Sequence, residues 1–191
     1  KPRFQYVLAQ LYQMDGEREA ARNAYQKVIK MQPSNEMDFN ARLRLAQLEK
    51  SPQDGIKLLN KMAKLDKNKD QLDQIYGTIG DVYLAQKDTV KALEYYEKAI
   101  ESSVQHGMAK AKVLVTAGDI YYQQRNYIKA SPCYKEATQI LSAESEQYAR
   151  IQRRSETLDE LVVEYSMVQL QDSLQHLATL SQAEQQTDPA P

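Results

Sequence analysis

Cysteine and histidine are almost absent from this chain of 191 residues. Cys133 is its one cysteine, which excludes an internal disulfide and a cage of thiolate metal ligands. His106 and His176 are its only histidines, so a histidine-rich metal centre is nearly excluded as well. Glycine and proline number 6 each, too few for the many turns of an all-β fold. These shortages argue against a disulfide scaffold and a metalloprotein.

An excess charge of one sign and long hydrophobic runs are also lacking. Lysine and arginine total 25 and aspartate and glutamate total 26, so the net charge is −1. Such a balance gives no electrostatic reason to bind nucleic acid or an anionic membrane. Apolar residues make up 42% of the chain, but no run approaches the ~20 residues of a membrane-spanning helix. We expect a folded, largely helical chain with no nucleic-acid partner and no membrane insertion by this segment.

Tryptophan is absent and phenylalanine occurs only twice, yet there are 13 tyrosines, and an internal repeat accounts for many of them. Small residues and tyrosines recur at a fixed offset of 38 in the pairs Gly80/Gly118, Tyr83/Tyr121, Ala92/Ala130, Tyr96/Tyr134 and Ala99/Ala137. The same positions occur 71 residues earlier as Ala9, Tyr12, Ala21, Tyr25 and Val28. That larger offset implies one more unit, which Ala46 and Gly55 supply. This unit is shorter by three residues at its turn, where Ser51 and Pro52 resemble an N-cap and a first helical residue.

Within each unit the apolar spacing is helical. Ala21, Ala24, Tyr25 and Val28 follow one helix face, and turn residues such as Asp15-Gly16 separate the stripes. Each unit is therefore predicted to be two antiparallel helices, in which a small residue lets the helices approach and an aromatic ring one turn further on fills the gap. We expect four units in residues 1–141, at about 3–34, 36–67, 73–104 and 111–141.

The recurring order of small residue, Tyr, turn, Ala, Tyr and Ala, with Pro33 closing the first unit, resembles the tetratricopeptide repeat. The resemblance covers about residues 3–141 and implies an all-α fold, a right-handed α-solenoid of antiparallel helix pairs. The departures are the missing tryptophan, Gly55 in an alanine position, and no closing proline in the later units. Helix pairs of this kind cannot bury their apolar faces alone, so neighbouring pairs must stack.

The end of the chain has a different pattern. Residues 142–180 are predicted to form a C-terminal helix pair on the last repeat, with a break near 165–169 because the apolar stripe slips in phase there. Residues 181–191 are predicted to contain the start of a truncated helix and a disordered tail. The chain begins almost directly at a helix, without an evident cap, so we expect it to be part of a longer protein.

No motif for catalysis or cofactor binding is present, and we expect a protein that is not an enzyme and holds no cofactor or metal. His106 lies in an inter-repeat stretch, where an exposed turn histidine is more common than a catalytic one. His176 lies off its leucine stripe, so a solvated side chain is favoured over a ligand. Cys133 is interpreted as an inert thiol, packed or semi-exposed, rather than a reactive one. Pro132 is expected either to delay the start of its helix or to bend it.

Binding of another protein is the function that the pattern favours. The first helices of stacked pairs line a concave groove, which suits an extended peptide or a partner helix. The predicted groove residues are Tyr6, Gln10, Gln13, Arg44, Gln47, Gln74, Thr78, Asp81, Lys112, Asp119, Tyr122 and Gln123. The family's clamp for a C-terminal carboxylate is not supported, because its lysine and asparagine positions hold other residues here.

Two further sets of residues leave alternatives open. Asp81 and Asp119 each follow a repeat glycine and either bind a cation together or are solvated acids of the wall. Tyr95, Tyr122 and Tyr127 lie off the core stripe and are candidates for an exposed contact surface.

Three stretches resemble a narrower group. Residues 3–48, NYIKASPCYKEA at 126–137 and VVEYSMVQLQDSLQHLATLSQAE at 162–184 are similar to tetratricopeptide-repeat lipoproteins of Bacteroidetes that serve gliding motility and type IX secretion. This resemblance implies a scaffold on the periplasmic side of the outer membrane whose partners are secretion-machinery components. The alternative is a general peptide-binding adaptor, cytoplasmic in that case, or the sensory repeat region of a signalling protein. An enzyme is the third and least supported hypothesis.

Overall fold

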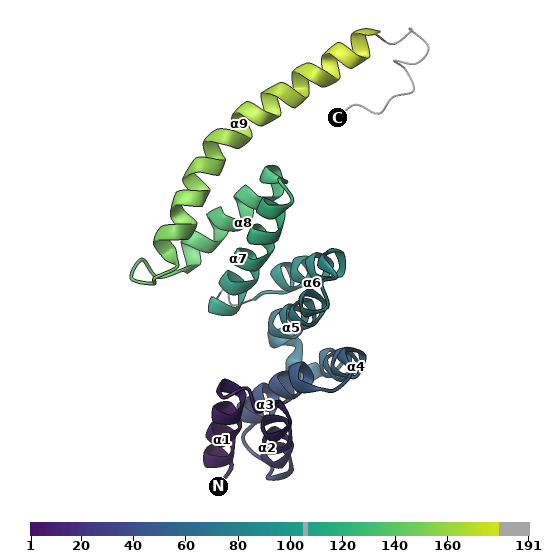
Figure 1. The fold of residues 1–191 in the computed structure, drawn as a ribbon, viewed down its shortest axis with the longest axis vertical. Coiled ribbons are helices and arrows are strands. Elements are labelled where there is room, and N and C mark those ends of the chain that lie inside the picture. Colours follow the sequence, from purple (N-terminus) through teal and green to yellow (C-terminus); the bar gives the residue numbers. More distant parts are fainter. Residues whose placement is uncertain (105–106, 180–191) are drawn as a thin grey trace. The chain divides into compact units, whose positions relative to one another are not determined.

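The structure, a computed structural model, describes residues 1–104 and 107–179, without the side chains of Gln169 and of 176–179. In this part of the chain all regular elements are helices and there is no strand, so the predicted all-α class is confirmed. The helices shown in Figure 1 are α1 (Pro2–Met14), α2 (Arg18–Lys30), α3 (Asn35–Leu48), α4 (Pro52–Ala63), the 3-10 helix η1 (Asp66–Gln71), α5 (Leu72–Ala85), α6 (Thr89–Glu101), α7 (Met108–Gln123), α8 (Tyr127–Ile140) and α9 (Tyr148–Thr179).

The chain forms two compact units, residues 1–113 and 114–191, with the division inside α7. In the first unit, consecutive helices α1 to α5 pack against one another, and α5 packs against α6. In the second unit α9 packs along α8. Residues 105–106 and 180–191 lie outside the described residues, and with them the prediction of an exposed turn histidine at His106 and the predicted truncated helix and tail at 181–191.

Small residues let the two helices of a pair approach, but the ring that fills the space is not the one predicted. A Cβ atom built on Gly80 would lie 2.5 Å from the ring of Tyr96, and one on Gly118 would lie 3.0 Å from that of Tyr134. Both rings belong to the second helix of the pair, whereas the sequence pattern suggested the tyrosine one turn along the first helix. The fully buried Tyr96 and Tyr134 thus lock each pair across its interface.

The second pair departs from the others where the sequence lacks three residues. Here α3 ends at Leu48 and α4 begins at Pro52, with Ser51 at the N-cap position but no hydrogen bond from its side chain to the helix. A Cβ atom on Gly55 would lie 2.2 Å from the backbone oxygen of Ala46. Glycine is therefore required at this position by close contact between two backbones.

The C-terminal part differs from the sequence prediction of two helices. The helix α9 runs without interruption from Tyr148 to Thr179, so the predicted break near 165–169 is wrong. The apolar stripe does slip in phase, but the slip changes which face of α9 is apolar and does not interrupt the helix. Residues 143–179 contain no glycine or proline that would end the helix. In the same unit α8 continues through Pro132, which therefore does not delay the start of that helix.

Candidate functional site

The predicted groove residues fall into three groups by exposure. The exposed ones are Gln10, Arg44, Lys112, Tyr122 and Gln123. The half-buried ones are Tyr6, Gln13, Gln47, Gln74, Asp81 and Asp119. Thr78 is buried, and its hydroxyl donates to the carbonyl oxygen of Gln74 at 2.7 Å. The prediction that Thr78 lines the groove is therefore corrected, because its one hydroxyl proton already satisfies its own helix.

Asp81 is part of a polar cluster that joins the two helices of its pair. Its carboxylate accepts a hydrogen bond from the hydroxyl of Tyr96 at 2.8 Å and another from the ammonium of Lys112 at 2.9 Å. Tyr96 lies on α6, and Lys112 lies 31 residues after Asp81. The carboxylate of Asp81 is thus paired with other side chains of the protein. It fits neither of the two predicted alternatives, a solvated acid or a cation ligand.

Asp119 repeats this arrangement in the second unit. It accepts a hydrogen bond from the hydroxyl of Tyr134 at 2.6 Å, and it pairs with Arg150 at 3.4 Å and with Arg154. Arg154 also donates to the Tyr134 hydroxyl at 3.0 Å, so the three side chains form one network. Both arginines lie on α9, which is therefore fastened to α7 and α8 by charge as well as by packing.

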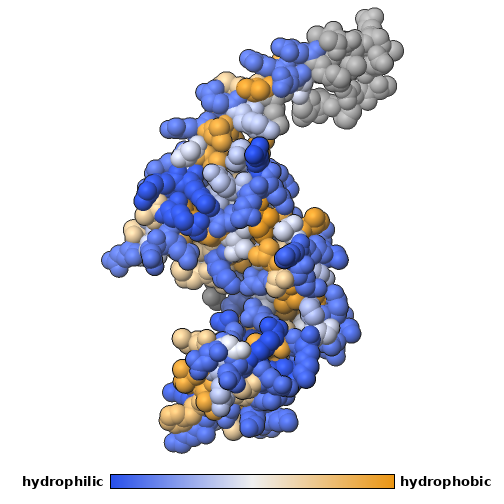
Figure 2. Space-filling view, in the orientation of Figure 1, coloured by the Kyte–Doolittle hydropathy of each residue, from blue (hydrophilic) through white to orange (hydrophobic). Residues whose placement is uncertain are grey.

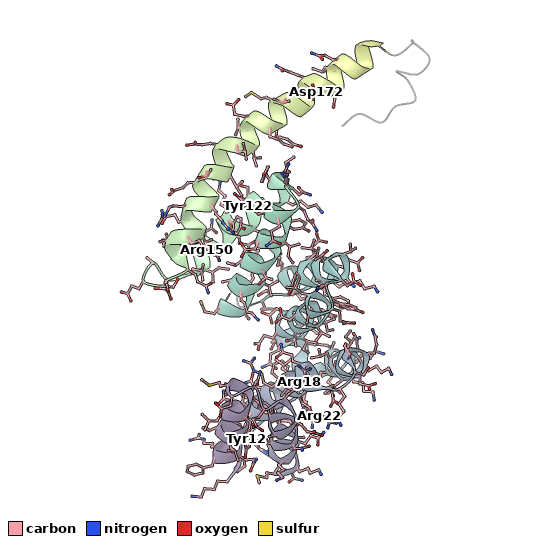
Figure 3. All side chains as sticks on the ribbon, in the orientation of Figure 1. Tyr12, Arg18, Arg22, Tyr122, Arg150 and Asp172 are labelled. Carbon is pink, nitrogen blue, oxygen red and sulfur yellow. The ribbon has the colours of Figure 1, made fainter. Side chains whose placement is uncertain are left out.

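Tyr122 contacts the same helix, although 39% of its side chain stays exposed. The guanidinium of Arg154 lies 4.8 Å from the centre of the Tyr122 ring, a cation–π distance. The ring of Tyr127 lies 5.7 Å from it, edge to face. Figure 3 shows Tyr122 and Arg150 where α9 runs beside the preceding helices. Two predicted groove residues, Asp119 and Tyr122, thus contact α9 rather than an open wall.

Burial fixes the protonation of the tyrosines in these clusters. Removal from water raises the pKa of Tyr96 well above its ordinary value, and the negative charge of Asp81 adds to the effect. Burial likewise raises the pKa of Tyr134, and its hydrogen bond to Asp119 raises it further, although Arg154 acts in the opposite direction. Both phenols therefore stay protonated and donate to their carboxylates over the whole neutral range.

The first pair has a neutral version of the cluster. The hydroxyl of Tyr25 donates to the side-chain oxygen of Gln13 at 3.0 Å. The ring of Tyr6 meets that of Tyr25 edge to face at 5.6 Å between centres. Burial raises the pKa of Tyr25, while the nearby positive charge of Arg44 partly opposes that shift. Tyr6, Gln13 and Arg44 therefore surround one buried phenol, whereas Gln10 points to solvent.

Beside the short turn of the second pair lies a hollow of about 330 Å³. Two predicted groove residues, Gln47 and Asp81, line it. Arg18 lies on its wall and donates to the carbonyl oxygens of Gln47 at 2.7 Å and Glu49 at 3.3 Å. Arg22 pairs with the side chain of Glu49 at 3.1 Å. A guanidinium from the preceding pair thus caps the last turn of α3, where the missing residues leave carbonyl groups exposed.

Sequence reasoning missed Arg18, Arg150 and Arg154. The signal for Arg150 was present, because it follows Lys112 by the same 38 residues that separate Asp81 from Asp119. The buried Ile151, Ser155 and Leu158 of α9 likewise follow Val113, Ala117 and Ile120 at that offset. The first half of α9 therefore takes the place of the first helix of a fifth unit. Arg18 had no repeat counterpart and could not be found in this way.

The tyrosines predicted to form an exposed contact surface are mostly engaged within their own units. Tyr95 is half-buried and stacks on Tyr83 at 5.5 Å between ring centres, with Tyr76 at 6.3 Å. Tyr127 is also half-buried, and Tyr122 alone of the three predicted tyrosines is classed as exposed, at 39%. The predicted surface is therefore corrected to an internal tyrosine ladder at Tyr95 and to the contact with α9 at Tyr122.

Other kinds of site find little support in the described residues. No three side chains of His, Cys, Asp or Glu gather there as metal ligands. No described helix is both long and apolar enough to cross a bilayer. Cys133 is half-buried on α8, and the side chain of His176 lies outside what the structure describes.

Comparisons with known proteins agree with this architecture. Residues 71–143 and 2–35 match the tetratricopeptide repeat family, together more than half of the chain. The crystal structure of MamA is similar with a TM-score of 0.52 at 20% identity, over 80% of this chain and 83% of that chain. The crystal structure of BtubC from P. vanneervenii is similar with a TM-score of 0.62 at 14% identity, over 98% and 82% respectively. No curated protein matches the sequence.

Proposed function

Because this chain belongs to the tetratricopeptide-repeat proteins, we propose that it is a non-catalytic scaffold that binds other proteins through the first helices of its first three pairs. The observation that carries the proposal is the exposure of Gln10, Arg44 and the half-exposed Gln74 on α1, α3 and α5. These side chains are not buried in the repeat interior, whereas Asp119 and Tyr122 each contact Arg154 of α9. The open part of the wall thus lies in residues 1–113.

The chemistry of this wall suits a peptide or helix with mixed polar side chains. Glutamines offer donors and acceptors, and Arg44 adds one positive charge. The hollow beside Gln47 and Asp81 has room for a side chain of the partner, and the apolar Ala46, Val82 and Ala85 lie on its wall. Polar contacts around a small apolar pocket are typical of specific recognition by a preformed groove.

As the finer proposal, the protein is a scaffold of the type IX secretion and gliding machinery on the periplasmic side of the outer membrane. Its support is the resemblance of residues 3–48, 126–137 and 162–184 to lipoproteins of that machinery. The alternative is a general adaptor or a sensory repeat region, since the wall itself suits any extended partner. The two differ in the identity of the proteins bound.

The test is a pull-down from a Bacteroidetes envelope extract with the 191-residue chain as bait. A groove variant carries Gln10→Glu, Arg44→Glu and Gln74→Lys. A matched control carries Lys27→Glu, Lys61→Gln and Glu94→Gln on exposed positions of the second helices, with the same net change of charge. Mass spectrometry identifies the bound proteins, and circular dichroism checks that all three baits are folded.

We expect the parent and the control to retain secretion-machinery proteins and the groove variant to lose them. Equal retention by the groove variant would exclude the wall as the binding surface. Retention of other proteins by the parent and control, with no secretion component, would reject the finer proposal and favour the adaptor.

A further inference from the structure

The linker between α4 and α5 departs from the regular repeat. Residues 31–34 alone join α2 to α3, whereas the linker 64–71 after α4 is longer and contains the 3-10 helix η1. Asn68 of η1 is buried, and its side-chain nitrogen donates to the carbonyl oxygen of Met62 at 2.8 Å. A buried amide with its partner in place holds η1 against the end of α4. The extra turn is therefore a fixed part of the first unit.

A hollow of about 300 Å³ lies between η1 and the helices α3 and α4. Phe39 and Met62, which are buried in the core of this unit, form part of its apolar lining. Leu58 is half-buried on the same lining, and Leu65 is 47% exposed. Ligand pockets in proteins begin at about this volume, so the hollow has room for an apolar side chain of a partner.

Cations outnumber acids on the lining of this hollow. Its charged residues are Arg42, Lys61, Lys67 and Asp38. The carboxylate of Asp38 accepts a hydrogen bond from Arg42 at 2.9 Å and lies 3.8 Å from the ammonium of Lys67. Asp38 thus holds these two cations beside the apolar lining, but it cancels only one positive charge. The hollow therefore keeps a net positive charge.

The segment around the hollow carries a wider excess of positive charge. Residues 57–69 contain five lysines and one acid, whereas the net charge of the whole chain is −1. All five lysines are exposed, and Figure 2 shows mainly hydrophilic side chains over α4. A local excess of this kind attracts a partner of opposite charge even where the net charge of the chain does not.

The apolar lining indicates which anionic partner fits. Single-stranded nucleic acid combines phosphate contacts with bases stacked on exposed aromatic rings, but the aromatic residue on this lining, Phe39, is only 4% exposed. A peptide in which an apolar side chain stands between aspartates or glutamates would use both properties of the hollow. Its apolar side chain would enter the hollow, and its carboxylates would meet the surrounding cations.

We infer that this hollow is a second protein-binding site, which takes an acidic linear segment of a partner with an apolar side chain between its acidic residues. The inserted side chain contacts Leu58, Met62 and Leu65. The site is separate from the proposed groove, because none of the residues that line it is a predicted groove residue. Salt weakens the binding, since part of the attraction is electrostatic.

Fluorescence anisotropy of a labelled peptide with the 191-residue chain tests the inference. The probe peptide has a Leu-Phe pair with glutamates on both sides, and a control probe has Ala-Ala in place of that pair. Lys67→Glu reverses a charge of the hollow, and Leu65→Asp removes its exposed apolar residue. Lys27→Glu is the matched control, with the same change of charge on α2. All three positions are exposed, so each variant is expected to keep the parent's helical circular dichroism.

We expect the parent and Lys27→Glu to bind the probe equally, and Lys67→Glu and Leu65→Asp to bind it about tenfold more weakly. The Ala-Ala probe should bind the parent about tenfold more weakly as well. The groove variant of the pull-down should bind the probe as Lys27→Glu does, which separates this site from the proposed groove.

Three results would overturn the inference. The first is a probe that does not bind the parent. The second is equal binding of the Leu-Phe and Ala-Ala probes, or of the probe to the parent and to Leu65→Asp, because the attraction would then be one of charge alone. The third is tighter binding of the parent to polyuridine RNA or to phosphatidylserine vesicles than to the probe, which would assign the hollow to phosphate groups.

Discussion

At the scale of single residues, the turns inside two of the four helix pairs are conformationally strained. The residue before the N-cap of the second helix is in the left-handed region at Gly16 (φ 77°), Lys87 (φ 63°) and Arg125 (φ 59°). These positions recur at the repeat offsets, yet only the first holds glycine. A side chain with a Cβ atom pays a steric penalty in this region, which the fold imposes on Lys87 and Arg125.

Glycine at these turns should stabilise the protein. Lys87→Gly and Arg125→Gly each relieve the Cβ clash and should raise the free energy of unfolding by about 0.5–1 kcal/mol. Urea unfolding followed by circular dichroism measures the change. Lys61→Gly, at an exposed position inside α4, is the control and should lower stability by about 1 kcal/mol. A loss of stability in the two turn variants would show that their side chains do more than occupy the turn.

The buried phenols predict a dependence on alkaline pH. The folded state raises the pKa of Tyr96 above the ordinary value of 10.0. Stability from this group is therefore complete below pH 10 and falls as the pH rises further, because only the unfolded chain then releases the proton. Tyr96→Phe should lower stability at pH 7, since Asp81 loses a donor, and should make the decline above pH 10 less steep. Unfolding in urea at pH 7 to 11 measures both effects, and an unchanged alkaline slope would contradict the assignment.

At the scale of elements, the two halves of α9 differ in their surroundings. Its first half repeats the buried positions of a first helix and closes the last pair through Asp119, Arg150 and Arg154. Asp159 adds a further link, since it accepts from Ser131 at 2.8 Å and from Lys135 at 3.1 Å. Its second half carries exposed apolar side chains such as Met167 and Leu170.

The link at Asp159 predicts a dependence on acid. The hydrogen bond from Ser131, followed by that from Lys135, lowers the pKa of Asp159. Its contribution is therefore present above the ordinary value of 3.8 and is lost as the pH falls through the lowered pKa. Asp159→Asn should be less stable than the parent at pH 7, and the difference should shrink toward pH 2. Thermal unfolding at both pH values tests this, with Glu164→Gln as a carboxylate control that should change little.

At the scale of the whole molecule, the two compact units should respond separately to local damage. Contacts in a repeat protein are mostly between neighbouring elements, so a loss at one end does not spread far. Arg154→Ala removes hydrogen bonds to Asp119 and Tyr134 in the second unit. Hydrogen exchange should then accelerate in residues 114–160 and remain unchanged in residues 1–63. Faster exchange in α1 to α4 would contradict this independence.

The sequence predicted much of the repeat because its period fixes which residues face inward. Gly80, Gly118, Tyr96 and Tyr134 were assigned to the repeat, and Pro52 lies at the first position of α4 as expected. The prediction failed where periodicity contains no information on partners. The position of Thr78 in the helical period is that of a groove residue, but its hydroxyl donates a hydrogen bond to its own helix. Tyr95 stacks on the ring of Tyr83.

By itself, the sequence determined the helical class, the order of the helices and the family, since these depend on local spacing and on recurring small residues. Only the tertiary structure decided the state of the candidate groove. Asp81 and Asp119 pair with tyrosines and cations from other helices, and Tyr122 contacts Arg154 of α9. The physical reason is that a hydrogen bond or a ring contact requires two side chains, often distant in sequence, to lie next to each other in the fold. The helical period of the sequence does not specify such pairs.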